Sequence, residues 1–153
     1  MARHPRWVRR AFAEEDLAAM TEAIAAAERQ TSAEIRVHLE DRLPRGAADD
    51  ALARAREVFT RLGMQQTAQR NGVLIYLALA DHHLAIVGDE GIHGRVGDGY
   101  WQRVRDLMVE RLHAGRARDA VVDAIADVGR VLTTHFPRRP DDVNELSDRV
   151  SLN

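Results

Sequence analysis

The sequence contains no cysteine, which excludes structural disulfides, cysteine nucleophiles and thiolate zinc sites. It also lacks any run of about 20 apolar residues, the length that a helix needs to cross a membrane. Residues 1–11 form a basic N-terminal arm, but the apolar stretch of a secretory signal does not follow it. We therefore expect no direct membrane insertion and a cytoplasmic protein.

Strong charge of one sign is missing as well. The formal net charge is −2, which gives no general attraction to nucleic acid, so we expect no nucleic-acid partner. The sequence has no G-x-S-x-G, no G-x-x-x-x-G-K-[ST] and no H-E-x-x-H motif. A cluster of glycines does not follow the dinucleotide fingerprint either: Gly88, Gly91, Gly94, Gly97 and Gly99. No single motif names a reaction.

What the chain does have is an unbroken apolar run at residues 73–79. A strand with one face in water alternates polar and apolar residues, so this run predicts a strand buried on both faces. A short turn at Asp81 and His82 and a second apolar run at residues 84–87 follow it, which indicates an antiparallel hairpin.

The remaining pattern places helices around this hairpin. Residues 34–39 alternate as a strand, and apolar residues at helical spacing predict four helices, the first ending near Arg29 and the others near residues 52–62, 100–112 and 120–132. Strand, helix and strand make a parallel βαβ unit. We predict an α/β fold: a three-layer α/β/α sandwich whose small mixed sheet combines the parallel βαβ unit with the antiparallel hairpin, with helices on both faces. The domain would span residues 12–137, followed by a polar C-terminal strap at 138–153.

This topology brings oxygen-bearing side chains to one end of the sheet. Glu34 and Asn71 precede the two parallel strands, and the reversed third strand ends at Asp89 and Glu90. Calcium prefers six to eight oxygen ligands, so Glu34, Asn71, Asp89 and Glu90 form a predicted metal site. Four acids of the strap are further candidates for its shell: Asp141, Asp142, Glu145 and Asp148.

Structural roles for the same residues stay open at this stage. Asp89 can cap a turn, Glu34 can pair with Arg36 or Arg70, and Asn71 can support a bend.

Six ordered segments resemble blocks of the TPM domain family, which is named for a thylakoid lumen protein, a photosystem II repair protein and a receptor modulator. These are residues 31–37, 59–64, 70–76 and 88–92, and, in the short soluble bacterial branch, 135–137 and 142–148. The resemblance implies an α/β/α sandwich, calcium binding in several members and acid phosphatase activity in some. The aspartate-containing N-terminal motif of longer members is absent; residues 7–10 stand in its place.

Two functions therefore remain. The first is a divalent-cation (calcium) binding interaction or stress-related module without strong catalysis, acting on a protein partner, with membrane proteins among the candidates. The alternative is a cation-assisted acid phosphatase (phosphomonoesterase) in which Asp89 is catalytic and Arg70 or Arg95 holds the phosphate.

Overall fold

Four strands form one mixed sheet at the centre of the molecule. The computed structural model describes residues 4–44, 50–138 and 150–152. The strand order is β3-β2-β1-β4, with β1 at Ile35–Glu40, β2 at Val73–Ala78, β3 at His83–Gly88 and β4 at Ser151–Leu152. β1 and β2 are parallel, β2 and β3 are antiparallel, and β4 lies parallel to β1. The parallel βαβ unit and the reversed hairpin are both confirmed.

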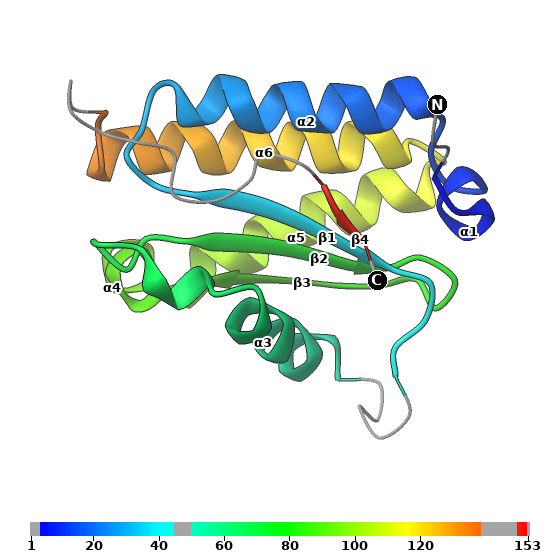
Figure 1. Ribbon diagram of the computed structural model, residues 1–153, viewed down its shortest axis with the longest axis horizontal. Coiled ribbons are helices and arrows are strands. Elements are labelled where there is room, and N and C mark those ends of the chain that lie inside the picture. Colours follow the sequence, from blue (N-terminus) through cyan, green and yellow to red (C-terminus); the bar gives the residue numbers. More distant parts are fainter. Residues whose placement is uncertain (1–3, 45–49, 139–149, 153) are drawn as a thin grey trace.

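Helices cover both faces of this sheet, as Figure 1 shows. One face packs against α2 (Glu14–Glu28), α5 (Asp98–His113) and α6 (Ala117–His135), and the other against α3 (Ala51–Arg61) and the short η1 (Met64–Gln66). All six residues of β2 are buried, which explains its unbroken apolar run. The predicted three-layer α/β/α fold is confirmed.

The side chains of β1 alternate between the two layers. Ile35, Val37 and Leu39 join the large core under α2 and α6. The polar residues between them point to the other face, where His38 and Glu40 are buried beneath α3.

Two short helices were not predicted. α4 (Glu90–Val96) occupies the glycine-rich stretch after β3, and Asp89 caps it by accepting a hydrogen bond from the Glu90 N–H. Asp98 is the first residue of α5, which is preceded by Gly97 at φ +76°. At the N-terminus, α1 (Arg6–Arg9) carries Val8, which is fully buried.

Several boundaries and orientations differ from the expectations. β1 runs one residue later than the predicted strand, and the hairpin turn takes the four residues 79–82. Leu52 was expected on the apolar stripe of α3 but is 40% exposed at the start of that helix. Of the predicted strap, residues 139–149 lie outside the described residues, and Ser151–Leu152 form β4.

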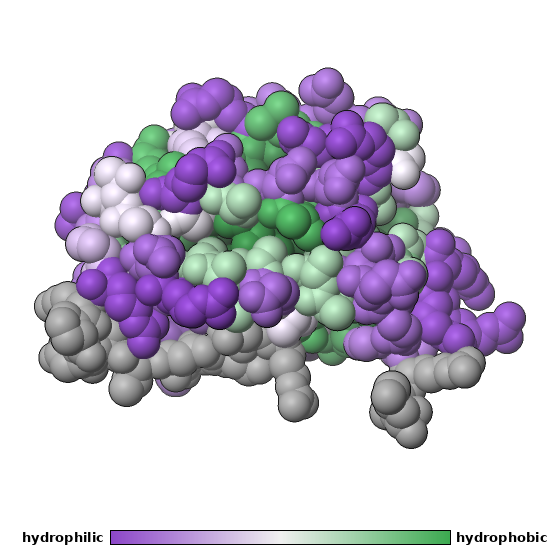
Figure 2. Space-filling model, turned by 90° about the horizontal axis from the view of Figure 1, so that it is seen from above, coloured by the Kyte–Doolittle hydropathy of each residue, from purple (hydrophilic) through white to green (hydrophobic). Residues whose placement is uncertain are grey.

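Figure 2 shows the outer face of α2 and α6, where apolar residues gather in the middle of a polar surround. Small side chains of both helices line a shallow groove there, including Ala23, Ala26 and Ala126. Among the described helices, none is both long enough and apolar enough to cross a membrane.

Candidate functional site

The rim at the start of β1 and β2 brings three distant segments together. The Val73 N–H donates to the Glu34 carbonyl at 2.8 Å, and the Asp89 N–H donates to the Gly72 carbonyl at 2.9 Å. Glu34, Gly72 and Asp89 therefore continue the register of the sheet by one row, with the glycine between the two acids. Residues 34 and 89 lie at the same end of the molecule, and both are almost buried, at 2% and 8% exposed.

The glycine in this row leaves room for a backbone oxygen. A Cβ atom on Gly72 would lie only 3.0 Å from the Met64 carbonyl oxygen. Any larger residue would push η1 away from the sheet, because that contact is with backbone rather than with a flexible side chain. The rim thus combines two carboxylates with a carbonyl oxygen, all ligand types that calcium accepts.

Asn71 is the most unusual residue at the rim. Its backbone N–H donates to the Thr67 hydroxyl at 3.2 Å, which fixes the bend before β2. Its side chain is 1% exposed, yet neither amide atom has a hydrogen-bond partner within the described part of the chain. Neighbouring segments bring two more buried oxygens in the same state, Ser32 Oγ and Gln65 Oε1. Such groups cost about 1–3 kcal/mol each when unsatisfied, so they call for an explanation.

Asp89 is engaged in two interactions besides its place at the rim. Arg70 Nε and Nη2 donate to its carboxylate oxygens at 3.0 and 3.3 Å, while one of these oxygens also caps α4. Arg70 lies 3.6 Å from Glu90 as well, and the Asp89 carboxylate raises the pKa of the Arg70 guanidinium. Arg70 is 47% exposed, whereas Asp89 is 8% exposed, so the Arg70 side chain lies between the Asp89 carboxylate and the solvent.

Some of the structural roles expected for the predicted site residues are present. Asp89 caps the first turn of α4, and Arg70 forms ion pairs with Asp89 and Glu90. Within residues 4–44, 50–138 and 150–152, no three His, Asp or Glu side chains form a group that could hold a metal. The acids Asp141, Asp142, Glu145 and Asp148 lie outside the described residues.

A second polar cluster lies at the opposite end of the sheet, beneath α3. Arg54 donates from Nε and Nη2 to the two carboxylate oxygens of Glu40, at 2.7 and 2.9 Å, and both residues are buried. The adjoining Tyr76 ring stacks on His38, with centroids 6.1 Å apart. The sequence could have indicated this buried ion pair, because Arg54 lies among the apolar residues on the buried face of α3.

His38 is 1% exposed and lies near charged residues of its own strand β1 and of α3. Its Nδ1 lies 2.9 Å from Ser151 Oγ on β4. Burial lowers the pKa of the imidazole to about 4. Glu40 opposes this shift, and Arg61 and Arg54 of α3 and Arg36 of β1 reinforce it. His38 is therefore a neutral ring at pH 7.

Comparisons with known proteins agree with this architecture. This chain is similar to the BA42 protein from the psychrophilic bacterium Bizionia argentinensis, whose structure was determined by NMR. The two chains are 37% identical and superpose with a TM-score of 0.83, over 93% of this chain and 95% of BA42.

Two N-terminal domains share the fold at lower identity. One is from a protein of P. gingivalis, with 19% identity, a TM-score of 0.61 and coverage of 84% and 83%. The other is from the cg2496 protein of Corynebacterium glutamicum, with 13% identity, a TM-score of 0.59 and coverage of 95% and 93%. A search of the curated proteins found no match.

The sequence model of the TPM domain matches residues 9–131, a span that includes β1, β2, β3 and the whole rim. The chain therefore belongs to the TPM domain family.

Proposed function

We propose that this protein binds a divalent cation of the calcium class at the rim formed by Glu34, Asn71 and Asp89. The observation that carries the proposal is the buried Asn71 amide, whose oxygen has no hydrogen-bond donor among the described residues. Asn71 directly precedes Gly72, the residue between Glu34 and Asp89 in the register of the sheet. A cation would give that oxygen a partner and would place positive charge between the two buried acids. The Met64 carbonyl next to Gly72 supplies a further oxygen of the type that calcium uses.

In this proposal Arg70 competes with the cation. Its guanidinium occupies the Asp89 oxygens that the metal would need, and it is half-exposed, so it can move into solvent without opening the core. Binding would exchange one positive charge for another at Asp89 and would move Arg70 toward Glu90. Glu90 is therefore assigned a peripheral role, since its side chain is 76% exposed.

The experiment is a calcium titration of the 15N-labelled protein, with the amides of residues 34, 71, 72 and 89 as reporters. We expect saturable shifts at these positions, and at least a tenfold weaker response in Asp89→Asn, which keeps the shape of the helix cap. Asp119→Asn is the matched control, because Asp119 also pairs with an arginine, Arg116, in the first turn of a helix. Equal titrations of wild type and Asp89→Asn would overturn the proposal.

The alternative function, a cation-assisted acid phosphatase, stays a prediction of the family resemblance. A catalytic Asp89 needs an oxygen directed at the substrate, whereas Arg70 and the Glu90 N–H occupy both of its oxygens. Arg95, the second candidate for holding phosphate, lies over the Phe136 ring at 4.8 Å. Hydrolysis of a phosphomonoester by the wild type, lost in Asp89→Asn with calcium binding measured in parallel, would favour the enzyme.

A further inference from the structure

β3 is an edge strand with unused backbone groups. In an antiparallel pair, residues alternate between those that bond the neighbouring strand and those whose N–H and C=O point outward. Asp89 bonds to Gly72 on β2, so the outward positions are Leu84, Ile86 and Gly88. No hydrogen bond made by the described residues uses the backbone of these three.

At the opposite edge of the sheet, other residues of the chain bond to the backbone of β1. The outward N–H of Ile35 on β1 donates to the Glu28 carboxylate at 2.7 Å, and β4 pairs with His38 and Leu39. Edge strands that are left uncovered are templates for pairing with another chain. The part of the chain that the structure describes therefore covers one edge and leaves the other edge accessible.

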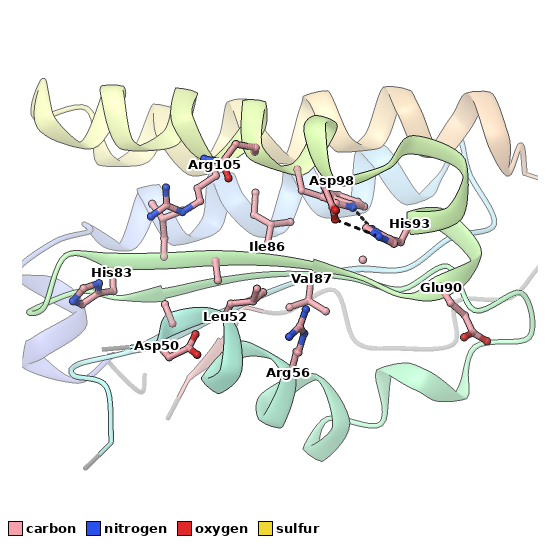
Figure 3. Close-up of a pocket in the computed structure, with 16 residues that line it drawn as sticks. Asp50, Leu52, Arg56, His83, Ile86, Val87, Glu90, His93, Asp98 and Arg105 are labelled. Carbon is pink, nitrogen blue, oxygen red and sulfur yellow. Dashed lines mark hydrogen bonds and ion pairs between the residues drawn. The ribbon is translucent and has the colours of Figure 1, made fainter. Parts of the chain in front are cut away.

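A groove of about 660 Å³ runs along this accessible edge, and we call it the β3 groove. Figure 3 shows α3 on one side of the strand and α5 on the other. Leu52 and Arg56 line the α3 wall, while Trp101 and Arg105 line the α5 wall. A six-residue strand such as β3 is about 20 Å long, so the groove offers room for an extended segment rather than for a globular ligand.

The acidic side chains around the groove already have partners. Asp50 caps α3 through the Ala53 N–H at 3.0 Å. Asp98 lies 3.4 Å from His93 Nε2, a contact drawn in Figure 3. Glu90, at the end nearer the cation rim, is next to Arg70.

The basic side chains of the groove are far less engaged. Arg56 is exposed and makes no ion pair with any described residue, and Arg105 reaches only its neighbour Asp106, at 4.0 Å. Figure 3 places these two arginines on opposite sides of β3. Alternate side chains of an added strand would point toward one wall and then the other, so each wall presents a cation to them.

We propose that the β3 groove binds an extended acidic peptide segment of a partner protein, which adds to the sheet as a strand beside β3. Backbone hydrogen bonds to Leu84, Ile86 and Gly88 supply the affinity, as in other cases of strand addition. Acidic side chains of the segment pair with Arg56 and Arg105, and apolar ones contact Leu52 and Trp101.

A second copy of this chain fits the groove less well. Pairing β3 with its own counterpart would bring the Arg56 and Arg105 side chains of α3 and α5 in two copies close to each other, and like charges at short distance repel. The chain's own tail is also poorly placed, because Arg138 is held at Gln30 and Ser151 lies beside His38 on the β1 side.

The probe is an N-acetylated eight-residue peptide in which pairs of glutamates alternate with pairs of valines, so that both faces of the strand carry acidic and apolar side chains. It is added to the 15N-labelled protein. We expect saturable shifts and slower hydrogen exchange at the amides of residues 84, 86 and 88. A peptide with lysine in place of glutamate should bind about tenfold more weakly, since two exposed ion pairs are lost. A version methylated on every backbone nitrogen should not bind, because it has no N–H left to donate to the strand.

The protein variant is Arg56→Glu/Arg105→Glu, which changes surface residues only and should reverse the preference toward the lysine peptide. Arg10→Glu/Arg118→Glu is the control, with the same net charge change at exposed positions outside the groove. Equal binding of the methylated peptide, or an unchanged preference in the groove variant, would overturn the proposal. So would shifts of residues 84, 86 and 88 that follow protein concentration without peptide, since a second copy would then hold the edge.

Discussion

Acidification should destabilise this protein through one buried histidine. His38 lies beneath α3, packed on Tyr76 and next to Glu40, with no room for hydration of a charged ring. In the unfolded chain its pKa has the ordinary value of 6.5, whereas burial lowers the pKa to about 4 in the folded protein. The unfolded state therefore takes up a proton at this position while the folded state does not.

The sign and size follow from proton linkage. Between pH 6.5 and about 4 the unfolded state binds more protons, so the free energy of unfolding falls as the pH falls. The window covers about 2.5 pH units, and each unit corresponds to 1.36 kcal/mol, which gives a loss of about 3 kcal/mol from this residue. The contribution is fully present above pH 6.5.

The measurement is urea unfolding at several pH values from 7 to 4, for the wild type and for His38→Asn. Asparagine keeps a polar atom near Ser151 Oγ but does not titrate, so its stability should fall less steeply with acid. His113→Asn, at an exposed position on α5, controls for the change of residue type. The reasoning is refuted if the wild type and His38→Asn lose the same free energy between pH 6.5 and 4.

Three further outcomes are expected. Arg54→Met should cost about 3–5 kcal/mol in urea unfolding because it leaves Glu40 charged and buried, and Arg54→Met/Glu40→Leu should recover most of that loss; no recovery would contradict this account. Gly91→Ala should lower the stability by at least about 1–3 kcal/mol, since its Cβ would lie 2.2 Å from the Gln69 carbonyl oxygen and 2.5 Å from that of Arg70; an unchanged thermal midpoint would argue against it. Arg70→Gln should strengthen calcium binding about two- to fivefold by removing a competing cation from Asp89, and weaker binding in the titration would count against that competition.

The fold could be predicted from the sequence because burial on two faces and burial on one face leave different patterns. The run in β2 required helices on both sides of the sheet, and the spacing of apolar residues supplied them. α4 was missed because it contains Gly91 and Gly94 and lies between Gly88 and Gly97, and glycines weaken any helix prediction. Its start depends on the cap from Asp89, an interaction that spacing alone does not reveal.

The candidate site was predictable only in outline. Topology alone brought Glu34 and Asp89 to one rim, since parallel and reversed strands fix which ends meet. Arg70 pairs with Asp89, and its backbone has the left-handed conformation, with φ 51°. The sequence does not reveal that conformation, so it could not show whether Arg70 pairs with Asp89 or with Glu34. The unmade hydrogen bonds of Asn71 depend on the packing around it, which no sequence pattern encodes.

The unequal edges of the sheet limit how large an assembly can become. A fibre in which one sheet continues from subunit to subunit needs two sheet edges on every subunit that can pair with a neighbour. Here the side next to β1 is already taken by Glu28 and by β4, and β4 has only two residues, too few to pair firmly with a neighbouring molecule. A strand that joins at β3 therefore terminates the sheet, and the expected product is a discrete complex rather than a fibre.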